Sequence, residues 1–166
     1  MYVPVQQLPD SARVWIYQSA QPFTPARQAE LAAVLEDFTS GWESHGIPLH
    51  ASFQIRFSHF IILAVDETYK DASGCSIDKS VNFLQELENR LGLNLFDRSR
   101  QAFLVENQVQ FVEVKNLKQE VQSAKITPET LTCNNLVATV GQLRDGWLLP
   151  AKESWLARYF RQVPQV

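Results

Sequence analysis

Apolar and polar residues alternate most clearly between positions 49 and 57 of the chain. This period of two predicts a half-buried β-strand with one polar face. A continuous apolar run follows from Phe60 to Val65, which predicts a strand covered on both faces. Ser58 and His59 lie between the two runs. We therefore expect a hairpin that turns at these two residues.

Apolar residues spaced three and four apart predict two amphipathic helices. The first runs from about 25 to 45, because Thr24 and Pro25 form a typical helix start. The second begins at a turn of Gly74, Cys75 and Ser76, with Ser76 as the N-cap, and ends at Gly92.

Further strands are predicted over 12–19, before the first helix, and over 102–105 and 109–114, after the second. The order is then β-α-β-β-α-β with one additional strand. That order is typical of an α+β fold with a ferredoxin-like (split βαβ) sheet and two helices on one face.

The chain beyond about residue 115 is harder to interpret. We expect a mostly helical C-terminal extension over about 115–166, behind an α+β core over about 12–114. Within it, the segment 136–147 fits a helix better than a hairpin, although Asp145 and Gly146 form a typical hairpin turn. No linker divides the chain, so we predict a single domain over 1–166.

Composition narrows the classes of partner. The chain has 166 residues, 45% of them hydrophobic, with a formal net charge of -3. An acidic chain without a basic run argues against nucleic acid as a partner. No apolar run reaches the roughly 18 residues that span a membrane, and no signal peptide is recognisable at the N-terminus. We expect a cytoplasmic protein with reduced thiols.

The segment with the most chemical potential is the predicted helix start at Ser73–Ser76. Backbone N–H groups at a helix start favour anions and thiolates. Cys75 as a nucleophile would need a base, for which His50 and His59 are the candidates. The simplest interpretation is structural: Gly74 permits the turn, Ser76 caps the helix and Cys75 packs as a small hydrophobic residue.

The same segment resembles a degenerate phosphate loop, since Gly74 is followed after four residues by Lys79 and Ser80. A true phosphate loop has a glycine before the lysine, whereas Asp78 stands at that place here. A carboxylate there would repel phosphate groups. Nucleotide hydrolysis is therefore the third hypothesis, behind ligand binding and thiol chemistry.

Asp66 and Glu67 follow the buried strand and are candidates for acid–base work. Adjacent residues on a strand point to opposite faces, however, so we expect a solvated strand end rather than a carboxylate pair. The histidines and cysteines show no spacing typical of a metal site. We expect no metal and no cofactor.

Three segments carry a family resemblance: 12–17, 51–80 and Ser154-Trp155. Through them the chain resembles, over nearly its whole length, a family of short uncharacterised bacterial proteins. Some members bear the automatic label "ABC transporter ATPase". This chain lacks a complete phosphate loop and an ABC signature of the Leu-Ser-Gly-Gly-Gln type. The resemblance therefore implies no activity and no catalytic residue.

The leading hypothesis is a non-enzymatic cytoplasmic binding domain. Its partner would be another protein, or a small anionic ligand at the helix start. A thiol-dependent enzyme using Cys75 is the alternative, and edge-to-edge pairing into a homodimer remains open. The candidate ligand-binding residues are Ser73, Gly74, Cys75, Ser76, Asp66, Asp78 and Lys79.

Overall fold

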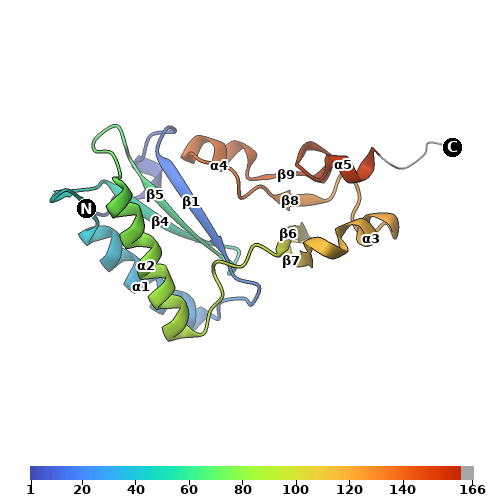
Figure 1. Ribbon diagram of the computed structural model, residues 1–166, viewed down its shortest axis with the longest axis horizontal. Helices are drawn as coiled ribbons and strands as arrows, with labels where there is room; N and C mark the ends of the chain where they lie inside the picture. Colours follow the sequence, from blue (N-terminus) through green and yellow to red (C-terminus); the bar gives the residue numbers. More distant parts are fainter. Residues whose placement is uncertain (162–166) are drawn as a thin grey trace. The chain divides into compact units, whose positions relative to one another are not determined.

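The computed structural model describes residues 1–161, which fall into two compact units. Unit 1 comprises Met1–Asp97 and Ala138–Arg144, and unit 2 comprises Arg98–Val137 and the chain from Asp145 onward. Figure 1 shows the elements of both units. Two compact units can belong to one domain, so the single domain over 1–166 stays a prediction.

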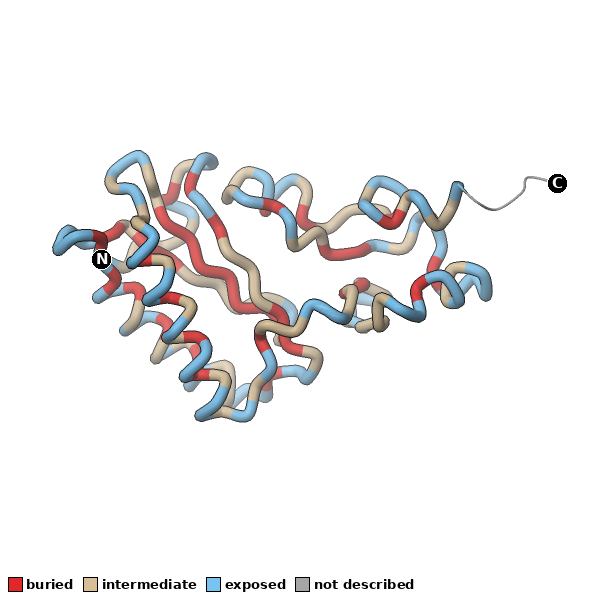
Figure 2. Tube along the Cα trace, viewed as in Figure 1, coloured by how far each residue is buried: buried red, intermediate tan, exposed pale blue. Residues whose placement is uncertain are grey.

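Unit 1 is built on a three-stranded antiparallel sheet with the order β1-β5-β4. Its strands are β1 (Arg13–Gln18), β4 (Ala51–Arg56) and β5 (Phe60–Val65). The predicted hairpin is confirmed, since β4 pairs with β5 through the turn at residues 57–59. Every residue of β5 is buried, as the continuous apolar run predicted (Figure 2).

Two helices, α1 (Pro25–Gly41) and α2 (Gly74–Leu91), cover one face of this sheet (Figure 1). The hydrophobic core of unit 1 lies between them and the sheet. It includes Leu31 and Leu35 from α1, Leu84 and Leu87 from α2, and Ile61, Leu63 and Val65 from β5.

Helix α1 ends at Gly41, four residues before the predicted end near 45. The chain then forms a short hairpin of β2 (Glu43–Ser44) and β3 (Ile47–Pro48). His45 and Gly46 make its turn, with φ of 50° and 76°. Positive φ at both central residues is the geometry of a tight hairpin turn, so Gly46 serves a turn and does not end the helix.

The N-cap of α2 is Ser73, and the prediction of Ser76 as the cap is wrong. The Ser73 hydroxyl accepts a hydrogen bond from the Ser76 backbone N–H at 3.2 Å, so Ser76 already lies in the first turn. Helix α2 does end at the predicted place, because Gly92 adopts a left-handed conformation with φ of 64°.

Unit 2 contains a separate four-stranded antiparallel sheet with the order β7-β6-β8-β9. Its strands are β6 (Arg100–Val105), β7 (Gln108–Glu113), β8 (Leu131–Cys133) and β9 (Leu148–Pro150). The strands predicted over 102–105 and 109–114 therefore exist. They pair with each other, and β6 also pairs with β8. They do not join β1-β5-β4, so the ferredoxin-like order is not confirmed.

The remaining elements are short. The predicted helix over 136–147 is present in part, as α4, which ends at Gly146 just before β9. The extension from 115 thus carries strands as well as helices.

No helix in residues 1–161 has the length and apolar content needed to cross a membrane. The short helices are η1 (Val5–Gln7), η2 (Val114–Asn116), α3 (Leu117–Gln122), α4 (Val140–Gly146), η3 (Ala151–Glu153) and α5 (Ala157–Phe160).

Candidate functional site

The hydroxyl groups at the start of α2 bind groups of unit 1 itself. The Ser73 and Ser76 hydroxyl oxygens lie 2.7 Å apart, and Ser76 Oγ donates to the Glu43 carbonyl at 3.0 Å. Trp42 Nε1 donates to the Ser76 carbonyl at 2.8 Å. The Ser73 backbone N–H also donates, to Ser44 Oγ at 3.4 Å. These hydrogen bonds hold the start of α2 against the segment that follows α1.

Cys75 lies in the first turn of α2 with its side chain exposed, whereas Cys133 in β8 is buried. The Cys75 thiol makes no hydrogen bond with any other described residue. Gly74, at the helix start, has nothing within 4 Å of the place a Cβ would occupy. The helix start is therefore open to solvent at these two residues, whereas Ser76 is buried.

The structure does not bring His59 to Cys75. His59 precedes β5 and its Nδ1 donates to the Ser19 carbonyl at 2.7 Å. Its neighbour Ser58 lies at the beginning of α1, where Gln28 Nε2 donates to Ser58 Oγ at 2.9 Å. The end of α1 lies at the start of α2, and a helix of its length spans about 25 Å. His59 and Cys75 thus lie at opposite ends of α1.

His50, the other candidate base, precedes β4 and stacks on Tyr69, with ring centroids 3.8 Å apart and planes inclined by 5°. The His50 carbonyl accepts the Asp66 backbone N–H at 2.9 Å, so His50 is at the same end of the sheet as Asp66. No hydrogen bond joins its ring to Cys75 among the described residues.

The candidate charged residues have separate partners. Asp66 accepts bonds from the backbone N–H and hydroxyl of Thr68, at 2.9 and 2.5 Å, and thereby stabilises a local turn. Glu67 accepts the Ala72 backbone N–H at 3.2 Å. Lys79 lies 3.9 Å from the Glu43 carboxylate, with both side chains largely exposed. Asp78 is also exposed on α2. These groups do not converge on one point.

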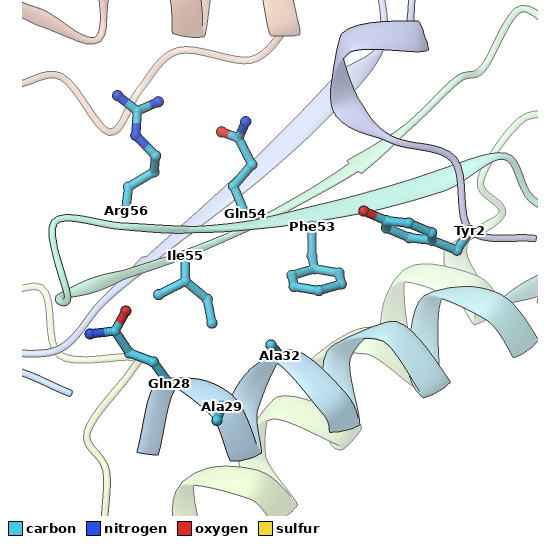
Figure 3. A pocket seen from close by; sticks show the side chains of 8 residues that line it. All are labelled: Tyr2, Gln28, Ala29, Ala32, Phe53, Gln54, Ile55 and Arg56. Carbon is cyan, nitrogen blue, oxygen red and sulfur yellow. The ribbon is translucent and has the colours of Figure 1, made fainter. Parts of the chain in front are cut away.

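A groove that the sequence did not reveal runs along the outer edge of β4 (Figure 3). Phe53 and Ile55 point from β4 toward α1, whereas Gln54 and Arg56 point to the other side of the strand. Small residues of α1 form its floor. Its volume is about 460 Å³, and its lining residues are Tyr2, Gln28, Ala29, Ala32, Phe53, Gln54, Ile55 and Arg56.

The main chain of β4 carries unused hydrogen-bonding groups in this groove. Ala51 directs its N–H and C=O outward, to the Met1 carbonyl at 3.1 Å and the Val3 N–H at 2.8 Å. Residues whose main-chain N–H and C=O point outward alternate along a paired strand. Phe53 and Ile55 therefore direct their N–H and C=O groups to the same edge as Ala51. Neither pair of groups has a hydrogen-bond partner among residues 1–161.

The alternation over 49–57 predicted the strand but carried no sign that it lies at the edge of its sheet. Among the described residues, no group of three or more His, Cys, Asp or Glu side chains is placed to hold a metal ion.

No protein-family model, curated protein or solved structure matches this chain.

Proposed function

We propose that this chain is a non-enzymatic interaction domain that binds an extended polypeptide segment along β4. The proposal is carried by the outward N–H and C=O groups of Phe53 and Ile55, which lie in a groove and have no partner within the described part of the chain. In strand addition, main-chain hydrogen bonds supply affinity and pockets for alternate side chains supply specificity.

The edge of β4 already accepts extended chain. Tyr2 pairs with Ala51 in parallel, through the two hydrogen bonds that Ala51 makes with Met1 and Val3. The bonding positions at Phe53 and Ile55 are the next two along the same edge. A sheet edge with unpaired groups is a template for another strand, so an added segment would continue this pairing.

The side chains of the groove favour an apolar residue in the added segment. Ala29 and Ala32 leave room above α1, and Phe53 and Ile55 provide apolar walls. Gln28 adds an amide at one end of the groove. We expect the bound segment to alternate, with apolar side chains toward α1 and polar side chains on the other face.

The other hypotheses stay predictions. An anionic ligand at Ser73–Ser76 would compete with hydrogen bonds that the two hydroxyls already make. A Cys75 enzyme needs a base, and a nucleotide site would have to tolerate Asp78. The geometry favours the β4 groove because the main-chain groups of Phe53 and Ile55 there have no partner among residues 1–161.

The test is selection of peptides from a random phage-displayed library on the immobilised protein, followed by titration of the selected peptides by fluorescence anisotropy. We expect saturable binding that Ala32→Arg weakens at least tenfold, because a long side chain would fill the groove. Ala33→Arg is the matched control, since Ala33 is exposed on α1 and does not line the groove.

Two results would reject the proposal. One is that no peptide is enriched over a blank surface. The other is that Ala32→Arg and Ala33→Arg weaken binding equally, which would place the peptide elsewhere.

A further inference from the structure

We infer that Val3 sets the direction and the register of the segment that binds along β4. The segment runs antiparallel to β4, and its last paired residue lies opposite Phe53. The inference rests on the proposed function, because it describes the ligand of the same groove. Its basis is the place that Met1–Val3 already occupies on this edge.

Val3 occupies the place beside Ser52. Tyr2 pairs with Ala51 in parallel, so the residues that follow them, Val3 and Ser52, also lie side by side. The chain then turns into η1 and makes no further pairing with β4 among the described residues. An added segment must therefore end, or leave the edge, before it reaches Ser52.

A parallel segment would leave one of the open groups unpaired. In parallel pairing, an edge residue bonds the two residues that flank the one opposite it, as Ala51 bonds Met1 and Val3. Phe53 would need a residue beside Ser52 to accept its N–H. Val3 holds that place, and its carbonyl makes no hydrogen bond with the Phe53 N–H. That N–H would be covered by the added strand without an acceptor, which costs stability.

An antiparallel segment satisfies all the open groups with three residues. In antiparallel pairing, a hydrogen-bonded pair of residues exchanges both main-chain bonds. One residue opposite Phe53 and one opposite Ile55 would thus pair the N–H and C=O groups of both. The residue between them lies opposite Gln54, whose own N–H and C=O face β5. The paired stretch ends at Val3 on one side and, on the other, at the turn residue Phe57, whose φ is 51°.

The side chains of such a segment meet different parts of the groove. Cross-strand partners share a face of the sheet, so the residues opposite Phe53 and Ile55 point toward α1, as those two do (Figure 3). The one opposite Phe53 comes next to Tyr2, whose ring centroid lies 5.7 Å from that of Phe53. The one opposite Ile55 lies toward Gln28, which bonds Ser58 in the turn. We expect a ligand that reads apolar, polar, aromatic in its own direction.

Spin labels on the peptide test the direction. A selected peptide carries a nitroxide at its N-terminus or at its C-terminus, and NMR records the broadening of the protein's amide signals. Val3 and Phe57 mark the two ends of the groove, about 17 Å apart along the strand. The C-terminal label should broaden the Val3 amide more than the Phe57 amide, and the N-terminal label should do the reverse. The same complexes with the nitroxide reduced are the control.

Peptide extension tests the register. Two residues added at the C-terminus of the shortest peptide that binds should change its Kd by less than about twofold in the wild type, because Val3 blocks their place. Val3→Pro removes the N–H that bonds the Ala51 carbonyl, which weakens the block. In that variant the same extension should tighten binding about fivefold. Val3→Ala keeps the N–H, so this matched control should behave as the wild type.

The outcomes separate the two proposals. Stronger broadening of Val3 by the N-terminal label overturns the antiparallel direction. An extension that acts alike on the wild type and on Val3→Pro overturns the block at Val3. The proposed function survives either result if Ala32→Arg still weakens the peptide. If no peptide binds, or if neither label broadens Val3 or Phe57, both proposals fail.

Discussion

The start of α2 and the edge of β4 are both rich in polar groups, yet they differ in whether those groups are already used. At the start of α2, the Ser73 and Ser76 hydroxyls and the Trp42 indole N–H all bind partners within unit 1. At the edge of β4, the main-chain groups of Phe53 and Ile55 have no partner among the described residues.

Residue type is therefore a weaker guide to a binding site than unsatisfied hydrogen-bonding capacity. The α2 start contains a thiol, hydroxyls and a lysine, and these residue types predicted a binding or catalytic site there. Its hydrogen bonds nevertheless serve the fold. The β4 edge contains ordinary strand residues, but an unpaired sheet edge is the feature that a second chain can complete.

The largest effect should follow from removing Trp42, which is 2% exposed and joins α1 to α2. Trp42→Ala should lower the free energy of unfolding by about 3–5 kcal/mol, because it leaves a cavity and an unpaired carbonyl. Urea denaturation followed by circular dichroism measures this. Trp155→Ala, at a tryptophan that is 38% exposed, is the control and should cost much less. Equal losses would mean that the α2 start is not a structural junction.

The next effect should come from the serines. Ser73→Ala and Ser76→Ala should each cost about 1–2 kcal/mol, because the first removes an N-cap and the second a buried hydroxyl. The urea midpoint should fall while the denaturant slope stays constant. Ser40→Ala, exposed on α1, is the matched control. Unchanged stability in both variants would mean that the hydroxyls are available for a ligand, and would favour the hypothesis of an anion site at Ser73–Ser76.

The smallest effect is expected at an exposed ion pair, where the polar groups are satisfied but not buried. Arg144 donates two hydrogen bonds to Asp10, at 2.7 and 3.1 Å. These bonds, and then the guanidinium charge, hold the pKa of the Asp10 carboxyl below its usual value. A lowered pKa stabilises the folded state above the unfolded-state pKa, and this contribution is lost as the pH falls through the folded-state pKa.

Asp10→Asn should therefore be slightly less stable than the wild type at pH 7 and equally stable in strong acid. Urea unfolding of both proteins over a series of pH values measures the difference. Asp37→Asn, at an exposed carboxylate of α1, controls for the loss of one negative charge. A difference that grows toward acid pH would contradict the ion pair.

Much of unit 1 could be predicted from the sequence because its signals are local. The alternation before Ser58, the apolar run of β5 and the glycine that ends α2 each depend on neighbouring residues. The cap of α2 was misplaced because Ser73 and Ser76 are three residues apart and are both good capping residues. Only the hydrogen bond between them distinguishes the two.

The arrangement of strands into sheets could not be predicted, because it depends on residues far apart in the chain. Strand β6 pairs with β8 across about thirty residues, as Phe103 and Thr132 show. The groove was missed for the same reason. Its exposed edge is defined by what pairs with β4, and the distant segment Met1–Val3 pairs with this edge at Ala51.

Amide hydrogen exchange at β4, followed by NMR with and without a saturating selected peptide, distinguishes an open strand edge from a covered one. The amides of Phe53 and Ile55 should exchange fast in the free protein and slowly in the peptide complex. The Gln54 amide, which faces β5, should stay protected throughout. Protection of Phe53 and Ile55 in the free protein, or no added protection with the selected peptide, would contradict an open edge that another strand completes.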